Sequence, residues 1–599
     1  MSNTQNTNRA EESTSRAITY PLLIVMSIIP LIVHQKQYAN HLDGYSWFTF
    51  ETTSNDFFLY YKSVALIAMA AIMLIILCLK IKANKQYQLI PKFLIPLGLY
   101  GLFIIISMIF SINPTFSLHG SMDQFESGFV LLSYLIFMYY AYLLIETEDN
   151  LEFLIKAWLI SMGVLCIIGL LQVLGHDFFA TTIGKRLILM KSYWEHLDAI
   201  DFAFGKNRIY LTLYNPNYVG VYATLAIPVL ATLLLFSKKI SMRIIYSILI
   251  IGMVICIVGS ESKTAFITLG VVVLFALLLF RKHIIKYWKF LIPGIIILII
   301  VFFVFDASIN HSYTNSIKNA IKSLHTANKP TVTRIDTLDN EIVINNLENP
   351  LHIQYYRNDT DYSFVVKDDD GKVLSTYNSE NEMFIDDERF KNIQLSPILI
   401  EETYGIKVTV DGATNYYFSN EAVEGNTGYY FYTPYGKWDK INNPDIFNMN
   451  QSMFSGRGYI WSRTIPQLKH YIIKGSGPDT FTLVFPQDDY IGLQNNGYLG
   501  SIVTKPHNLF LQIAVQTGVL SLIAFLILYI IYFVQSITLY MKHNFNSYFS
   551  QVGVGIFLST IGYMIAGITN DSTVGVAPIF WILLGLGFGI NRRLKLSKN

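Results

Sequence analysis

Long apolar runs occupy two parts of the chain, residues 17–306 and the stretch after residue 506. Individual runs are about 17–25 residues long, which is the length of an α-helix that crosses the hydrocarbon core of a bilayer. We therefore expect an all-α polytopic membrane protein with about twelve transmembrane helices. They are predicted at 17–34, 59–79, 93–111, 128–145, 151–174, 213–236, 244–260, 264–280, 289–306, 507–534, 549–569 and 576–591.

Residues 307–506 form a large polar region between the two groups of helices. From 331 to 438, short runs alternate apolar and polar residues, and Asp370-Gly371 and Asp411-Gly412 supply hairpin turns. This part is predicted to be an inserted β-sandwich or jelly-roll-like module. Residues 450–506 show helical spacing instead and are predicted to be a helical segment close to the membrane.

The distribution of Lys and Arg predicts the orientation of the helices. Only 14% of the 599 residues are charged, against roughly 25% in soluble proteins. With twelve helices, the basic clusters fall on one side, which the positive-inside rule makes the cytoplasm. The clusters are Lys80/Lys82/Lys85, Lys238/Lys239/Arg243, Arg281/Lys282/Lys286 and Arg592/Arg593/Lys595. Both termini are then cytoplasmic, residues 1–16 form a disordered cytoplasmic tail, and residues 307–506 are extracytoplasmic.

Composition excludes several classes of function. The net charge is +2, and no basic stripe interleaved with aromatic residues occurs in the polar region, so nucleic acid is not expected as a partner. The three cysteines, Cys78, Cys166 and Cys256, lie within predicted helices, and the sequence contains no zinc or redox motif. We expect neither a cofactor nor a bound metal.

The junction Lys505-Pro-His-Asn508 is a candidate site, because there the polar region re-enters an apolar helix at the outer surface. The N–H groups and partial positive charge of a helix N-terminus suit an anion, so Lys505 and Asn508 are predicted to bind substrate. A neutral His507 imidazole can accept a proton near pH 7, as a general base does. The structural alternative is that His507 only caps the helix.

Basic residues on the predicted outer face break the positive-inside pattern and indicate an anionic partner. Arg208 and Lys263 each lie beside the start of a membrane helix. Arg457 lies between two glycines, which allow a phosphate to approach its guanidinium closely. The alternatives are a surface ion pair for Arg457 and a solvated loop for Lys185, Arg186 and Lys191.

Several separated motifs resemble, in the same order, those of the O-antigen ligases and Wzy-type polysaccharide polymerases. They are Leu170–Gly175, Arg208–Asn217, Ser262–Thr264, Ser455–Trp461, Gly475–Phe481 and Pro506–Gly518. The resemblance covers the membrane core. The module at 331–438 is not part of the usual core of the family.

The resemblance implies a glycosyltransferase that takes its glycan from undecaprenyl pyrophosphate on the outer face of a bacterial cytoplasmic membrane, without a metal or a nucleotide sugar. It makes His507 the base that helps an acceptor hydroxyl attack the anomeric carbon, and Arg457 a phosphate ligand. Lys263 stands where the family usually has arginine. It therefore keeps the positive charge but lacks the planar, forked N–H groups of a guanidinium. The acceptor stays open: another lipid-linked repeat unit for a polymerase, or a lipid, wall polymer or protein for a ligase. Either activity fits capsule or cell-wall polysaccharide assembly.

Two other classes of protein are alternatives. A lipid-linked oligosaccharide flippase or other transporter would also have about twelve helices, but transporters usually show internal repeats and charges at mid-membrane. Here the basic residues gather on one face. A glycan-binding wall protein would act through the β module and use the helices as an anchor, for which twelve helices are too many.

Overall fold

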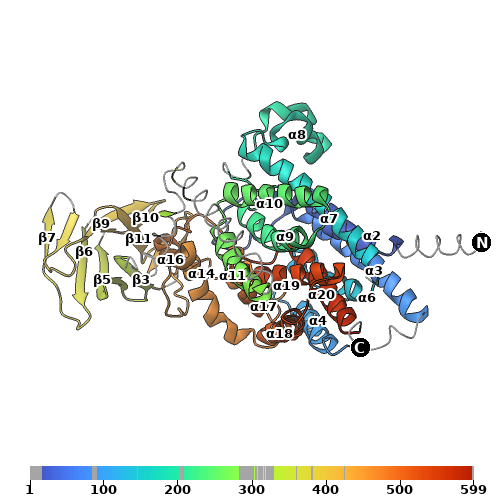
Figure 1. Cartoon of the computed structure of the whole chain (residues 1–599). Coiled ribbons are helices and arrows are strands. Elements are labelled where there is room, and N and C mark those ends of the chain that lie inside the picture. Colours follow the sequence, from blue (N-terminus) through green and yellow to red (C-terminus); the bar gives the residue numbers. More distant parts are fainter. Residues whose placement is uncertain are drawn as a thin grey trace, which may run out of the picture.

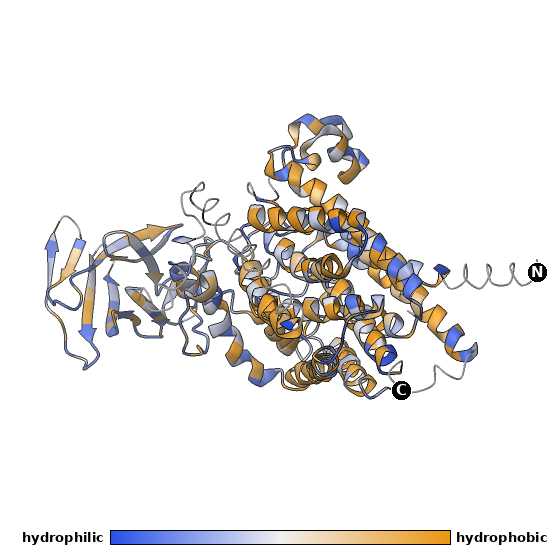
Figure 2. Ribbon diagram, in the orientation of Figure 1, coloured by the Kyte–Doolittle hydropathy of each residue, from blue (hydrophilic) through white to orange (hydrophobic). Residues whose placement is uncertain are grey.

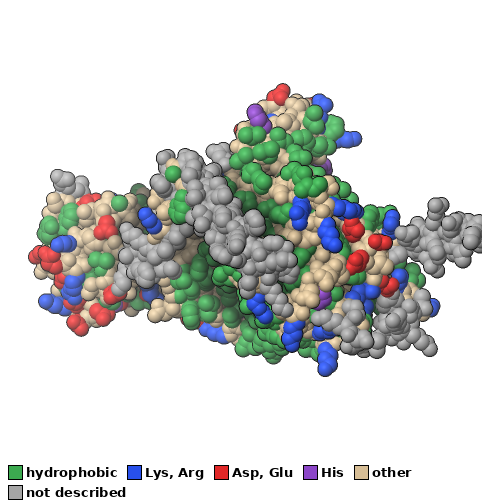
Figure 3. Space-filling view, in the orientation of Figure 1, with side chains coloured by type: hydrophobic (Ala, Val, Ile, Leu, Met, Phe, Trp, Pro, Cys, Tyr) green, Lys and Arg blue, Asp and Glu red, His purple; other side chains and the backbone are tan. Residues whose placement is uncertain are grey.

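The computed structural model describes residues 16–83, 91–144, 146–202, 204, 208–281, 330–358, 361–379, 382–423, 425 and 427–596, with isolated residues between 303 and 318. A helical body lies at one end of the molecule and a β region at the other, and the short helices α14 (Met453–Gln467) and α16 (Tyr490–Asn495) lie between them (Figure 1). Hydrophobic residues run along the helices of the body, whereas hydrophilic and hydrophobic residues intermix in the β region (Figure 2). In the space-filling view, hydrophobic side chains cover much of the visible face of the body (Figure 3).

Six helices in the described residues are long and apolar enough to cross a membrane, which supports a polytopic membrane protein. They are α3 (Tyr60–Ala83), α7 (Glu148–Val173), α9 (Pro216–Phe236), α10 (Ile240–Ser260), α18 (Val519–Tyr540) and α19 (Tyr548–Ala566). Shorter apolar helices are Tyr20–Leu31, which comprises α2, η1 and η2, and α4 (Leu94–Ile109), α6 (Gly128–Leu144) and α11 (Lys263–Leu279). The last helix is α20 (Ala577–Leu596).

The predicted number of twelve is not confirmed. The predicted helix at 289–306 lies outside the described residues except for Phe303. The predicted tail 1–16 also lies outside them except for Arg16, as do Lys85, Lys282 and Lys286 of the basic clusters.

The predicted helix 507–534 is interrupted. It consists of a short helix, α17 (Leu509–Gln516), and the long helix α18, separated at Gly518, whose φ is +109°. Residues 471–477 insert at the break. Ser476 N–H and Gly477 N–H donate to the carbonyls of Val515 and Gln516, at 2.8 and 2.9 Å, and the first N–H groups of α18 donate to the carbonyls of residues 471 and 472. One segment thus satisfies the last carbonyls of α17 and the first N–H groups of α18, which is why a continuous apolar run forms two helices.

Helix α19 is enclosed by α9, α11 and α20. Glycines on α19 permit this close packing: a Cβ on Gly555 would lie 2.4 Å from Thr232 Oγ1, and one on Gly562 would lie 3.0 Å from the Thr224 carbonyl oxygen. The packing fixes the start of the loop 567–576, which joins α19 to α20.

The β region consists of two antiparallel sheets that contribute to one hydrophobic cluster. A four-stranded sheet has the order β3-β4-β5-β6, and a seven-stranded sheet has the order β13-β12-β11-β10-β9-β8-β7. The strands are β3 (Val332–Thr337), β4 (Ile342–Asn346), β5 (Asn349–Asn358), β6 (Asp361–Asp368), β7 (Thr376–Ser379), β8 (Glu382–Ile385), β9 (Ile393–Ile400), β10 (Thr403–Val410), β11 (Thr414–Ser419), β12 (Tyr430–Tyr432) and β13 (Trp438–Asp439). A separate hairpin, β1 (Lys36–Ala39) and β2 (Thr53–Asp56), lies near the start of the chain.

Short helices join the β region to the helical body. They are α14 (Met453–Gln467), η6 (Leu468–His470), α15 (Phe481–Val484) and α16 (Tyr490–Asn495). Tyr490 and Ile491 of α16 belong to the hydrophobic cluster of the β region. The buried Asp489 beside them pairs with Arg463 of α14 at 2.9 Å. The remaining short elements are α5 (Pro114–His119), η4 (Phe178–Ala180), α8 (Thr182–Ile188) and η5 (Lys191–Ala199).

We predict that Gly475→Ala unfolds the junction between α17 and α18. Gly475 has a φ of +61°, and an added Cβ would lie 2.3 Å from the Gln516 carbonyl oxygen. The overlap should cost about 1–3 kcal/mol, in addition to about 1–2 kcal/mol for the left-handed backbone. The measurement is thermal unfolding of the purified protein in detergent. The matched control is Gly497→Ala, because Gly497 has a φ of +74° but nothing within 4 Å of an added Cβ. Equal Tm values for the two variants would contradict the prediction.

Candidate functional site

His507 and Asp571 form a pair at the start of α17. His507 Nδ1 lies 2.9 Å from Asp571 Oδ2, and the other oxygen of Asp571 accepts the Asn508 N–H at 3.2 Å. The His507 side chain is 36% exposed, whereas that of Asp571 is 1% exposed. His507 has a φ of +49°, a strained conformation for a residue other than glycine. When Nδ1 donates its proton to Asp571, Nε2 is an acceptor on the accessible side of the ring.

The N-terminus of α17 is satisfied by the protein itself. Asn508 Oδ1 accepts the N–H groups of Phe510 and Leu511, both at 2.9 Å, and Leu509 N–H donates to the Gly567 carbonyl at 2.8 Å. The expectation that free N–H groups of this helix bind an anion is therefore wrong. Asn508 Nδ2 also donates to the Ile568 carbonyl, so this side chain caps α17, and its contact with substrate stays a prediction.

Lys505 is a buried cation beside the pair. It is 4% exposed, its Nζ donates to Tyr218 Oη at 3.1 Å, and it lies over the rings of Tyr214 and Tyr218 at 5.2 and 5.3 Å. Burial alone would lower the pKa of Lys505, but Tyr218, Asp123 and Asp571 raise it above its ordinary value. Lys505 is thus charged, and it joins the start of α9 to the segment that precedes His507.

Arg457 lies close enough to Asp571 for its charge to act on the same carboxylate. Phe454, Ser455 and Gly456 all have positive φ, so regular helix in α14 begins at Arg457. Its guanidinium is largely buried, which lowers its pKa, while the charge of Asp571 raises it. Among the described residues the guanidinium forms no hydrogen bond or ion pair, so its N–H groups are free for a ligand. Trp461 Nε1, one turn further along α14, donates to the Pro506 carbonyl at 2.9 Å and holds this helix against the His507 segment.

Asp571 connects the three basic side chains. Burial would raise its pKa, but His507, Lys505 and Arg457 together lower it below the ordinary value. The carboxylate therefore stays ionised, orients the imidazole, and keeps two cations close to it.

Arg208 and Lys263 lie beside this centre and are not joined to it by any described contact. Arg208 pairs with Glu261 at 2.7 Å, and both side chains are about half exposed. Lys263 is exposed at the start of α11. The next residue, Thr264, lies 2.9 Å from Thr569 through their hydroxyl oxygens, in the loop that carries Asp571. Their roles toward substrate stay predictions.

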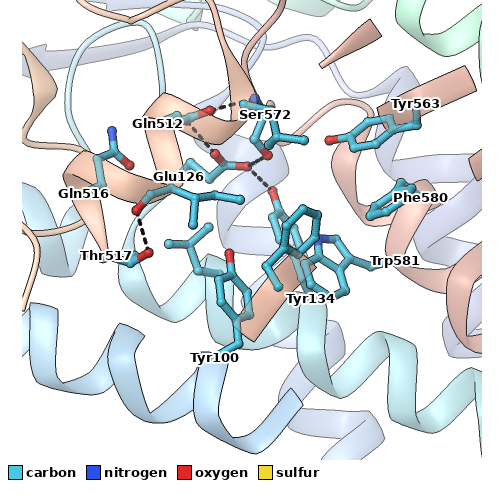
Figure 4. Close-up of a pocket in the computed structure, with 14 residues that line it drawn as sticks. Tyr100, Glu126, Tyr134, Gln512, Gln516, Thr517, Tyr563, Ser572, Phe580 and Trp581 are labelled. Carbon is cyan, nitrogen blue, oxygen red and sulfur yellow. Dashed lines mark hydrogen bonds between the residues drawn. The ribbon is translucent and has the colours of Figure 1, made fainter. Parts of the chain in front are cut away.

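Sequence reasoning missed Asp571, and also Glu126, Ser572 and Gln512 behind it. Glu126 accepts hydrogen bonds from Ser572 and Gln512 inside a small cavity (Figure 4). A signal for Asp571 exists: Thr569-Asn-Asp-Ser-Thr573 is a short polar gap between two apolar runs, on the same predicted side as His507. In the described residues no group of three His, Cys, Asp or Glu side chains is arranged to hold a metal ion.

Fold and site together define a helical membrane protein with an accessible histidine–aspartate pair and unpaired positive charge beside it. The family model described as O-antigen ligase matches residues 409–526, which confirms the resemblance found in the sequence. The match begins in β10, ends in α18, and contains Arg457, Lys505 and His507. No curated protein and no solved structure matches the chain.

We predict that Asp571→Asn destabilises the protein in a pH-dependent way. The lowered pKa means that the carboxylate contributes stability above its unfolded pKa of about 3.9, and that this contribution is lost as the pH falls through the folded pKa. Removing the partner of buried cations should cost about 3–5 kcal/mol near pH 7. Thermal unfolding between pH 7 and pH 3 checks this: the Tm difference from wild type should shrink below about pH 4. Asp43→Asn, at an exposed aspartate, is the control. A difference that does not change with pH would contradict the prediction.

Proposed function

We propose that the protein transfers a glycan from undecaprenyl pyrophosphate to an acceptor hydroxyl on the outer face of a bacterial cytoplasmic membrane. The observation that carries the proposal is the His507–Asp571 pair near the unpaired Arg457, with His507 and Arg457 inside the segment that matches the O-antigen ligases. The acceptor is a second lipid-linked repeat unit in a polymerase, or a lipid, wall polymer or protein in a ligase. Capsule or cell-wall polysaccharide would be the product.

His507 acts as the general base. Its Nε2 accepts the proton of the acceptor hydroxyl as the oxygen attacks the anomeric carbon of the donor sugar. Asp571 accepts the Nδ1 proton, holds the ring in the required tautomer, and stabilises the imidazolium that forms. The bond between the anomeric carbon and the phosphate oxygen breaks, and its electron pair leaves with undecaprenyl pyrophosphate.

Positive charge near His507 stabilises the leaving pyrophosphate. Arg457 has a planar fork of N–H groups that suits two phosphate oxygens, and the described structure leaves this fork unpaired. Lys505 adds a permanent, buried positive charge to the site. Lys263, which is exposed at the start of α11, would add a further positive charge for a phosphate at the surface. Since pyrophosphate is a good leaving group, one base and these cations are sufficient for transfer.

Hydrophobic contacts and an ion pair connect the β region to the candidate site. Its hydrophobic cluster includes Tyr490 and Ile491 of α16, and the buried Asp489–Arg463 pair connects α16 to α14, which carries Arg457. We therefore infer that the β region positions the growing or accepting glycan relative to Arg457.

We expect His507→Ala to lower kcat by about 10²–10⁴ because the hydroxyl loses its base. Arg457→Lys should lower kcat/KM for the donor about tenfold, since a point charge replaces the fork. The measurement is release of undecaprenyl pyrophosphate in proteoliposomes supplied with undecaprenyl-pyrophosphate-linked oligosaccharide. His470→Ala, at an exposed histidine outside the site, is the matched control. Normal release by a folded His507→Ala variant would refute the proposed chemistry.

The same assay separates the two acceptor classes. Lengthening of lipid-linked products without any addition identifies a polymerase, and release only after a separate acceptor is added identifies a ligase. Movement of the donor across the bilayer without release would show a transporter instead.

A further inference from the structure

A groove lies between the C-terminal ends of α18 and α20, away from the candidate site. Its volume is about 380 Å³, and it is lined by Val534, Gln535, Thr538, Leu539, Lys542 and Lys595. From Gln535 to Lys542 the lining residues follow one another at spacings that place them on one face of a helix. Among the described residues the lining combines apolar side chains with two cations and contains no acidic side chain. A molecule that fits this groove therefore offers hydrocarbon and negative charge together.

A buried hydrogen bond holds α20 against α18 beside the groove. The two helices pack side by side in the helical body (Figure 1), and Asn591 Nδ2 donates to Ser536 Oγ at 2.8 Å. Lys595 follows Asn591 by four residues, so it lies on the same face of α20, toward α18. The two lysines thus come from different helices and meet at one groove, which is fixed by the packing of those helices.

The two lysines have no partner in the part of the chain that the structure describes. Lys542 and Lys595 are exposed, and neither forms a hydrogen bond or an ion pair with a described residue. The neighbouring Arg592, in contrast, donates to Tyr142 Oη at 3.2 Å and lies over the same ring at 4.8 Å. Two like charges beside one groove repel each other, and an anion between them would offset that repulsion.

Gln535 supplies an unpaired amide within the groove. It is half-buried on α18, a helix that is long and apolar enough to cross a membrane, and its side chain forms no hydrogen bond with a described residue. An amide in apolar surroundings costs free energy unless a partner is present, and a hydrocarbon chain is no partner. The ester and phosphate oxygens of a phospholipid can accept its N–H groups. Gln535 lies about 10 Å deeper than Lys542 along the helix, toward the level of such esters.

The groove lies at the opposite end of α18 from the candidate site. Val519, the first residue of α18, follows the break after α17, and Gln535 lies about 24 Å further along the helix at 1.5 Å per residue. The hydrocarbon core of a bilayer is about 30 Å thick, so the two lysines reach the membrane surface opposite to His507. In the proposed orientation that surface is cytoplasmic, the side on which basic pockets between membrane helices bind phospholipid head groups.

We propose that this groove is a binding site for an anionic phospholipid of the surrounding membrane. The lipid phosphate lies between Lys542 and Lys595, the Gln535 amide donates to an oxygen of the head-group region, and an acyl chain lies along Val534 and Leu539. The bound lipid connects α18 to α20 and so stabilises the helical body. The inference goes beyond glycan transfer, and its test uses no glycan donor, so its outcome is independent of the proposed function.

The test is native mass spectrometry of the purified full chain, titrated with phosphatidylglycerol or with phosphatidylcholine of the same acyl chains. The wild type should bind phosphatidylglycerol more tightly. Each lysine near a membrane surface strengthens binding of an anionic lipid about fivefold, so Lys542→Gln/Lys595→Gln should weaken phosphatidylglycerol binding about 25-fold and leave phosphatidylcholine binding unchanged. The matched control is Lys238→Gln/Lys239→Gln, which removes two exposed lysines outside the groove and should leave both affinities unchanged.

Two further measurements make the test specific. Val534→Trp fills the apolar part of the groove and keeps both lysines, so the affinity for phosphatidylglycerol should fall about fivefold or more. Phosphatidylglycerol should raise the Tm of the wild type and of the control, but not that of Lys542→Gln/Lys595→Gln, because a ligand of the folded state stabilises it. Equal phosphatidylglycerol affinities of the wild type and this double variant would overturn the proposal. Unchanged affinity in Val534→Trp would also overturn it by showing attraction to surface charge alone, as would an equal rise in Tm with inorganic phosphate, which would show a site for a free anion.

Discussion

The terminal N–H and C=O groups of α17 need hydrogen-bond partners inside the helical body, and this requirement determines how the rest of the site is arranged. An eight-residue helix buried among membrane helices has no water to take its terminal N–H and C=O groups, so protein segments must do so. Residues 471–477 take its C-terminal carbonyls, and Asn508, Gly567 and Asp571 take its first N–H groups. Each of these contacts also places a functional residue, because His507 directly precedes the helix and Asp571 belongs to the segment that caps it.

Charge balance follows from this backbone requirement. Asp571 is a single buried carboxylate that faces His507, Lys505 and Arg457. Burying an isolated cation would cost free energy of folding, and so would burying a carboxylate without partners. Asp571 therefore stabilises Lys505 and orients His507. The Arg457 guanidinium, in contrast, has no hydrogen-bonding partner among the described residues, which is why we propose it as a ligand of the donor pyrophosphate.

The sequence predicts a polytopic helical protein with a β-rich region, and the described residues agree, because both features follow from local periodicity. The predicted twelve helices and the predicted β-sandwich are not confirmed. It also singles out His507, Lys505 and Arg457, since each lies at a visible boundary. The structure brings all three close to Asp571, and their roles toward substrate stay predictions. The polar gap at residues 569–573 marks Asp571 as a loop residue, but its pairing with His507 depends on α19 bringing residue 571 to residue 507, which no local pattern encodes. The break after α17 was missed for the same reason: the apolar run is continuous, and the interruption comes from a distant segment. Arg208 pairs with Glu261 on the surface, and its contact with an anionic substrate stays a prediction.

The separation of the site residues along the chain has a consequence for biosynthesis. Glu126 precedes α6, Arg457 and His507 follow the β region, and Asp571 lies between the last two helices. A nascent chain that has not yet delivered the loop 567–576 has neither the partner of His507 nor the cap of α17. The pair of His507 and Asp571 can therefore form only after residue 571 has left the ribosome. Helices that are inserted early in translation, such as α3 and α7, therefore precede the formation of this pair.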